Sequence, residues 1–236
     1  SWPNEVVQKI SSFILPYFIT VYLSARDLGI YSSAGFFVAA FTVLQGGFRT
    51  YWAAFMYKHY RDEQEKICKI HSYVSLGIIM LMSLCIIFQH VAYMLIGEAF
   101  HGSRLFFTLV LIPPLLGLWE QTTCYGIMIS KKNEEYMLVS IFSIAIYIIG
   151  IYVCIQKWNL LGAAVGGAFA AVMRYAILTC IGQKYYRSIR NLFETIIGLL
   201  LLLMLSVSNV FFYQDYWYEF IVVTFVIVFL FVTYKR

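Results

Sequence analysis

Apolar residues fall in eight long runs along the chain, and charged residues gather in the short stretches between them. Each run is close to the roughly 20 residues that a helix needs to cross a bilayer. The runs are Ile10–Ala25, Ile30–Tyr57, Ser72–Gly97, Leu105–Ser130, Tyr136–Ile155, Gly162–Gly182, Thr195–Tyr213 and Phe220–Tyr234. This pattern predicts an all-α integral membrane protein with about eight transmembrane helices.

The longest connection between runs is Lys58–Ile70, KHYRDEQEKICKI, in which charges alternate on a helical period. Such a segment either extends the preceding helix or lies along the membrane interface. A solvated linker is the alternative. The other connections are only a few residues each, so none of them forms a separate soluble domain.

Composition supports the membrane class. Of the 236 residues, 61% are hydrophobic and 12% charged, and the mean hydropathy is +0.77. A soluble domain of this size needs more charge to cover its surface. The five cysteines are scattered singly without a CxxC pair, and the four histidines have no metal-ligand spacing. We therefore expect no metal and no cofactor.

Lysine and arginine are distributed unevenly between the two predicted sides. If successive connections alternate sides, 12 of the 17 basic residues fall on one side, 3 on the other and 2 inside spans. This is a strong positive-inside signal, which predicts that both ends of the segment are cytoplasmic. The net charge of +5 is then explained by basic cytoplasmic loops, and no nucleic-acid partner is expected.

Three ionisable residues lie deep within predicted spans: Arg49, Glu120 and Arg174. Each precedes a cytoplasmic lysine, by 9 residues to Lys58, 11 to Lys131 and 10 to Lys184. At about 1.5 Å per residue, the three charges lie roughly 13–17 Å from that boundary, near the middle of a hydrocarbon core of about 30 Å. The spacing predicts that they meet at one depth.

A charge at mid-bilayer costs at least about 2.5–3.5 kcal/mol, so such residues usually face a bundle interior or a wet cavity. One interpretation is a structural ion pair between Glu120 and one arginine. Even then, two positive charges and one negative leave a net charge of +1. Surplus guanidinium suits an anionic substrate, because its planar fork of donors binds two oxygens of a phosphate. We expect Arg49 and Arg174 to bind substrate in a cavity, with Glu120 as a coupling-ion site or counter-charge.

Prolines and glycines indicate bent and closely packed helices. Pro16, Pro113 and Pro114 each remove a helix hydrogen bond and are expected to kink their spans. Gly162 and Gly166 have GxxxG spacing within a run of small residues, which is typical of close helix contacts. Bends beside a polar midplane are common in alternating-access transporters, although static bundles contain them too.

Catalytic signatures are missing from the sequence. It contains no GxSxG, HExxH or P-loop, and the predicted outer connections are too short to carry a site for chemistry outside the membrane. We therefore expect no catalytic residues and no enzyme activity.

Several segments resemble the C-terminal half of Wzx-type polysaccharide (O-antigen and capsule) flippases, in the multidrug/oligosaccharidyl-lipid/polysaccharide exporter superfamily. The first two spans are similar to the seventh and eighth helices of that family, with a junction at Asp27, Gly29, Tyr31 and Ala34. The stretch from Pro113 to Tyr175 resembles its tenth to twelfth helices, with a KKN turn at Lys131–Asn133 and an NLLGAA turn at Asn159–Ala164.

The resemblance implies a six-helix C-terminal lobe over residues 1–182, followed by a cytoplasmic linker and a final helix pair over 183–236. Because the chain begins with Ser1, it also implies that an N-terminal lobe is missing. The implied activity is flipping of undecaprenyl-pyrophosphate-linked oligosaccharide across the inner (cytoplasmic) membrane, driven by H⁺ or Na⁺. The implied partners are this lipid-linked oligosaccharide and the membrane lipids.

Three other functions are weighed against this one. A cation-coupled drug or small-molecule exporter of the same superfamily predicts a cavity rich in acidic residues. A membrane enzyme of polysaccharide assembly predicts polar residues near the outer face. A purely structural membrane subunit is the third alternative, and it predicts that the midplane charges only pair with each other.

Overall fold

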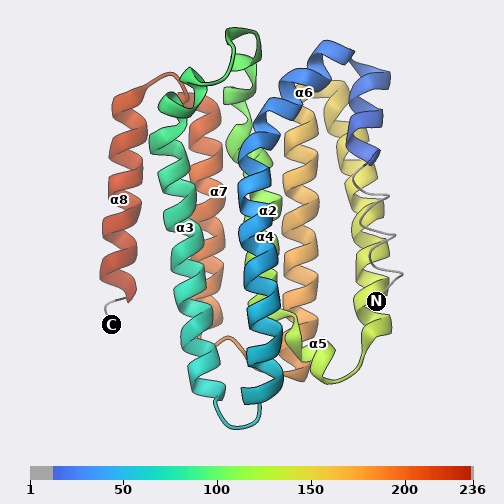
Figure 1. Cartoon of the computed structure of the whole chain (residues 1–236), viewed down its shortest axis with the longest axis vertical. Coiled ribbons are helices and arrows are strands. Elements are labelled where there is room, and N and C mark those ends of the chain that lie inside the picture. The colour runs from blue at the N-terminus through green and yellow to red at the C-terminus, as the bar shows by residue number, and fades with distance from the viewer. Residues whose placement is uncertain (1–12, 235–236) are drawn as a thin grey trace.

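The computed structural model describes residues 13–234, and this part of the chain consists of helices joined by short turns, without a β-strand. A short helix, Phe13–Tyr22, comes first. The elements that follow are α2 (Ala25–His59), α3 (Gln64–Met94), the 3₁₀ helix η1 (Glu98–Leu105), α4 (Phe107–Thr123), α5 (Tyr125–Ile129), α6 (Asn133–Tyr185), α7 (Leu192–Phe212) and α8 (Tyr216–Tyr234). The long helices lie roughly parallel and form one bundle (Figure 1).

Four of the described helices are long and apolar enough to cross a membrane: α2, α3, α6 and α7. The pair η1–α4, bent by 63°, makes a fifth candidate if it is one span. The predicted all-helical fold with several helices that could span a membrane is therefore confirmed.

Helix α6 is a hairpin rather than one rod. Its 53 residues include two with non-helical backbone, Trp158 and Asn159, and Asn159 has a left-handed φ of 50°. Asparagine is among the few non-glycine residues enriched at positive φ. The turn separates segments 133–157 and 160–185, which contain the two predicted runs Tyr136–Ile155 and Gly162–Gly182.

Glycines let the two segments of α6 pack backbone against backbone. A Cβ added to Gly166 would lie 2.7 Å from the carbonyl carbon of Gly150, and one added to Gly162 would overlap the carbonyl of Cys154. The GxxxG pair predicted to allow close packing thus faces the preceding segment of the same hairpin. Another close crossing brings Gly182 against the backbone of Thr123.

The charged connection Lys58–Ile70 differs from its prediction. Helix α2 ends at His59 and α3 begins at Gln64, so most of this segment forms the first turns of the following helix rather than extending the preceding one. Glu63, at the turn, forms an ion pair with Lys66 at 2.8 Å, and its other oxygen lies 2.9 Å from His59 Nδ1. These local pairs stabilise the turn that reverses the chain.

Connections with the predicted basic residues lie at one end of the bundle. The α2–α3, α5–α6 and α6–α7 connections are all at the lower end of Figure 1, whereas η1, the bend of α6 and the α7–α8 connection are at the upper end. We call these the basic end and the opposite end. The alternation assumed for the predicted loops therefore matches the arrangement of these described connections.

Helix α4 lies at the centre, in contact with α2, α3, α6 and α7. Its predicted span, Leu105–Ser130, is divided at Cys124 into α4 and α5. Buried His71 on α3 ties this region to α7, because its Nδ1 lies 2.8 Å from Thr122 Oγ1 and its Nε2 lies 3.1 Å from Thr195 Oγ1. Such polar contacts fix helix positions in an apolar bundle.

Two sequence predictions stay predictions. Helical backbone continues through Pro16, Pro113 and Pro114, and no kink angle is defined at these positions. The boundary expected between residues 182 and 183 falls in the last turn of α6, which ends at Tyr185. The predicted division of the chain into a six-helix lobe and a final helix pair therefore stays a prediction.

The α6 hairpin makes a testable contrast between neighbouring glycines. Gly166→Ala should lower the free energy of unfolding by about 1–3 kcal/mol, because its methyl group meets backbone that has no room to move. Gly167→Ala should not, since its Cβ would lie 3.6 Å from Tyr147 Cε2, an ordinary contact. Both changes gain the same helix propensity. The difference between the melting temperatures of the two detergent-solubilised variants therefore measures the effect of the steric overlap at Gly166. Equal melting temperatures would contradict the hairpin packing.

Candidate functional site

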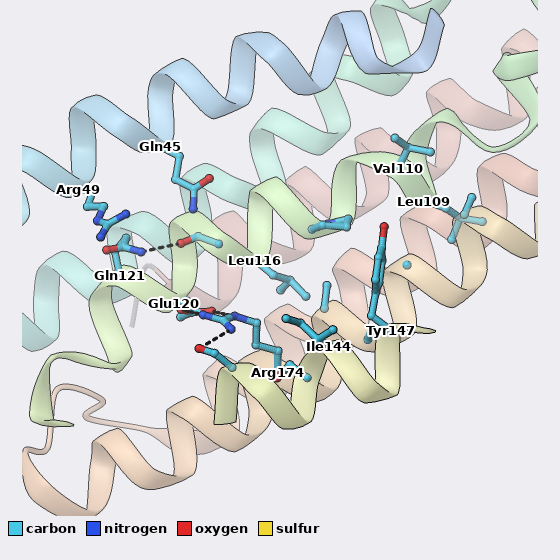
Figure 2. Close-up of a pocket in the computed structure, with 18 of the residues that line it drawn as sticks. Gln45, Arg49, Leu109, Val110, Leu116, Glu120, Gln121, Ile144, Tyr147 and Arg174 are labelled. Carbon is cyan, nitrogen blue, oxygen red and sulfur yellow. Dashed lines mark hydrogen bonds and ion pairs between the residues drawn. The ribbon is translucent and has the colours of Figure 1, made fainter. Parts of the chain in front are cut away.

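A cavity of about 430 Å³ lies between α2, α4 and both segments of α6. Figure 2 shows the labelled lining residues on α2, on α4 in the middle and on α6. Arg49 of α2, Glu120 of α4 and Arg174 of α6 all line it. The structure therefore brings together the three charged residues that the sequence predicts at one depth.

Glu120 and Arg174 form a two-point ion pair across the α4–α6 contact. Arg174 Nε donates to Glu120 Oε2 at 3.0 Å, and Arg174 Nη2 donates to Glu120 Oε1 at 3.1 Å. Only 7% of the Glu120 side chain and 24% of the Arg174 side chain are exposed. In this geometry the planar guanidinium fork matches the carboxylate, which makes the pair strong and directional.

Two residues of the first α6 segment complete the pair. The Tyr136 hydroxyl donates to Glu120 Oε1 at 3.2 Å and accepts from Arg174 Nη2 at 3.0 Å. Arg174 Nη1 donates to Ser140 Oγ at 3.2 Å, and the Ser140 hydroxyl in turn donates to the Tyr136 carbonyl. All three nitrogens of Arg174 are thus engaged.

Arg49 is in a different state. It is an exposed residue on α2, and among the described residues no hydrogen bond or ion pair engages its guanidinium. Gln45 lies one turn before it, and Figure 2 shows Arg49 and Gln45 extending from α2 toward the α4 segment that carries Gln121. Gln121 donates to the Gly117 carbonyl at 3.3 Å. This part of the cavity therefore offers an unengaged cation beside two amides.

The formal charge of the lining follows directly. Arg49 and Arg174 contribute two positive charges and Glu120 one negative, so the cavity carries a net +1. Glu120 is its single acidic lining residue and is already paired. The cavity is thus weakly cationic, with the surplus charge located on Arg49.

Sequence reasoning missed Tyr136, Ser140, Gln45 and Gln121. Spacing offers a signal for three of them, because Tyr136 and Ser140 are four residues apart on one helix face, and Gln45 precedes Arg49 by the same interval. Neutral polar residues are common in membrane helices, however, and only the packing of α4 against α2 and α6 selects these. Sequence alone also left the partner of Glu120 undecided, and the structure assigns Arg174.

No group of three or more His, Cys, Asp or Glu side chains that could hold a metal ion occurs in the described part of the chain. Comparisons with known protein families, curated proteins and solved structures find no significant match. The resemblance to polysaccharide flippases therefore stays a prediction that rests on the sequence segments quoted above.

The two arginines should differ sharply in their effect on stability. Arg174→Gln leaves a buried carboxylate without its partner and should lower the free energy of unfolding by about 3 kcal/mol. Arg49→Gln removes an exposed, unengaged charge and should change it by less than about 0.5 kcal/mol. Equilibrium unfolding in mixed micelles, followed by tryptophan fluorescence, measures both. Similar losses in the two variants would show that the ion pair is not what holds α4 to α6.

Proposed function

We propose that this chain is part of a membrane transporter that moves an anionic, lipid-linked oligosaccharide across the cytoplasmic membrane by alternating access. The single observation that carries the proposal is the unengaged guanidinium of Arg49 in a cavity within an apolar helix bundle. A charged residue inside an apolar bundle usually faces a partner or a wet cavity, and Arg49 is exposed and lines the cavity, where a partner from outside the protein can reach it. The missing partner is then a ligand with negative charge.

Phosphate chemistry fits this cation. A guanidinium binds two phosphate oxygens through parallel N–H donors, and the amides of Gln45 and Gln121 supply further donors nearby. An undecaprenyl pyrophosphate headgroup presents several such oxygens. In this proposal Arg49 is the first residue to bind the pyrophosphate.

Arg174 has a conditional role under the same proposal. Its donors are occupied by Glu120, Tyr136 and Ser140, so it binds the substrate only when Glu120 releases it. Protonation of Glu120, or binding of Na⁺ to it, removes the charge that holds Arg174. Glu120 is thus the counter-charge in the resting state and the candidate site of the coupling ion.

The proposed architecture has eight spans, with residues 1–182 as a six-helix lobe, 183–236 as a linker and final pair, and a second lobe across the cavity. The bend of α6 supports this count, because it divides one long helix into two segments of membrane-spanning length. The gathering of three connections at the basic end supports a cytoplasmic location for that end.

The alternative transporter, a cation-coupled drug exporter, predicts a cavity rich in acidic residues. Glu120 is the only acid among the lining residues, and Arg174 neutralises it. This observation favours an anionic substrate over a cationic one. The proposal assigns the chain no catalytic residue.

Replacing Arg49 tests the proposal in the cell of origin. Arg49→Ala should lower surface polysaccharide at least about tenfold, since a charged hydrogen-bond partner is worth about 1.5–3 kcal/mol. Membrane abundance, measured by immunoblot, should be unchanged, because Arg49 holds no other part of the bundle. Surface polysaccharide is quantified by electrophoresis of the extracted glycan.

A matched control is Arg61→Ala, which removes an arginine from the α2–α3 connection outside the cavity, where its Nε donates to the Tyr60 hydroxyl. This variant should export normally. Normal export in both the Arg49→Ala and Arg174→Ala variants would contradict the proposal that these arginines bind the substrate in the cavity.

A further inference from the structure

The end of the cavity away from Arg49 has a different chemistry. Its lining includes Tyr31 of α2, Leu109 and Val110 of α4, and Tyr147 of α6. Val110 precedes Glu120 by ten residues, which places the two about 15 Å apart along α4. The lining residues at this end carry no charge, so the cavity is cationic at one end and neutral at the other.

The tandem proline leaves a backbone acceptor at the neutral end. A helical carbonyl accepts from the N–H four residues on, or three residues on in a tighter turn. For Val110 these positions are Pro114 and Pro113, and neither has an N–H. Val110 is only 9% exposed, and buried carbonyls are rarely left without a partner. Both helical donors for this carbonyl are therefore missing, at a residue that lines the cavity.

Two tyrosine rings flank the same position and are held by packing. Tyr31 stacks on Phe106 with ring centres 5.5 Å apart and an angle of 16° between the planes. Tyr147 packs over Gly167, whose added Cβ would lie 3.6 Å from the ring. Figure 2 shows Tyr147 extending from α6 toward the α4 segment that carries Leu109 and Val110. Among the described residues, neither phenol hydroxyl has a hydrogen-bond partner in the protein.

These groups select a neutral ligand rich in hydroxyl groups. A carbonyl acceptor needs a ligand donor, and phenol hydroxyls both donate and accept. Between this end and Arg174, the α6 wall is made of small residues, Ala164, Gly167, Ala170 and Ala171, which leaves room for a sugar ring. A metal cation fits poorly, because the one carboxylate of the cavity is bound to Arg174. A polyprenyl tail fits poorly too, because it cannot satisfy the carbonyl.

We propose that Tyr31, Tyr147 and the Val110 carbonyl form a sugar-binding subsite that holds a hexose ring of the substrate while Arg49 holds its pyrophosphate. This inference rests on the proposed function. It fixes the orientation of the substrate, with the phosphates toward the basic end and the glycan toward the opposite end. It also assigns to the proline pair the role of supplying an acceptor.

The test compares two lipids on the purified protein in nanodiscs. The probes are undecaprenyl pyrophosphate alone and undecaprenyl pyrophosphate that carries N,N′-diacetylchitobiose, a disaccharide long enough to reach Val110 from the cationic end. Wild-type protein should bind the glycosylated lipid at least about fivefold more tightly, the equivalent of one hydrogen bond of about 1 kcal/mol. Dissociation constants come from tryptophan fluorescence titrations.

Two variants should remove this preference without changing the affinity for the bare lipid. Tyr147→Phe deletes one hydroxyl and keeps the ring. Pro114→Ala restores the N–H that Val110 lacks, so the carbonyl no longer needs a ligand donor. Pro16→Ala is the matched control, because it makes the same exchange in Phe13–Tyr22, outside the cavity lining, and should keep the full preference. Unchanged affinity for the bare lipid shows that each variant is folded.

The outcomes separate the two proposals. Equal binding of both lipids by wild-type protein, or a preference retained in both Tyr147→Phe and Pro114→Ala, overturns the sugar subsite and leaves the phosphate site standing. Failure of wild-type protein to bind either lipid, or bare-lipid affinity unchanged in Arg49→Ala, overturns the proposed function and the subsite with it.

Discussion

The ion pair between Glu120 and Arg174 is the constraint on which the arrangement of the bundle depends. Either residue alone would place an uncompensated charge in apolar surroundings, at a cost of several kcal/mol. Together they satisfy each other only if α4 and α6 are held in one register and rotation, because both oxygens of Glu120 are used. The pair thus fixes where the central helix meets the hairpin, and through α4 it fixes the neighbours of that helix.

The α6 hairpin supplies the geometry that the pair requires. Tyr136 and Ser140 lie on the first segment and Arg174 on the second, so the site needs both segments side by side. Backbone contact at Gly150 and Gly166 brings them close enough. On α2, Gln45 and Arg49 face the cavity, and Gln45 lies against Gly117 of α4. A Cβ added to Gly46 or Gly47 would meet no atom within 4 Å, so no neighbouring side chain packs on α2 at these two positions.

The sequence predicted the helices and the three charged residues of the site, and it did not predict how their side chains pair. Hydrophobic runs locate helices, because the cost of burying a charge sets where a membrane span can end. The same cost made Arg49, Glu120 and Arg174 candidate site residues, because each lies within a hydrophobic run. Counting residues to the flanking lysines gives depth but not the direction in which a side chain points. The sequence could not choose between Arg49 and Arg174 as the partner of Glu120, since that choice depends on helix rotation. The helical start of α3 at Gln64 was missed because alternating charges do not reveal which of two adjoining helices they belong to.

The unequal states of the two arginines have a consequence for transport under the proposed function. A cavity with two unengaged arginines would bind a pyrophosphate tightly and release it slowly, because each charged contact must be broken. Here Glu120 already occupies Arg174 with the two-oxygen geometry that a phosphate would use. The substrate phosphate and Glu120 therefore compete for the same donors. The binding free energy gained when Arg174 contacts the phosphate is offset by the free energy lost when Arg174 leaves Glu120. Such an exchange lets the site gain a second cation while substrate is present and return to a neutral pair when it leaves. The internal carboxylate thus sets how strongly the cavity holds its anion, and any coupling ion that neutralises Glu120 changes that strength.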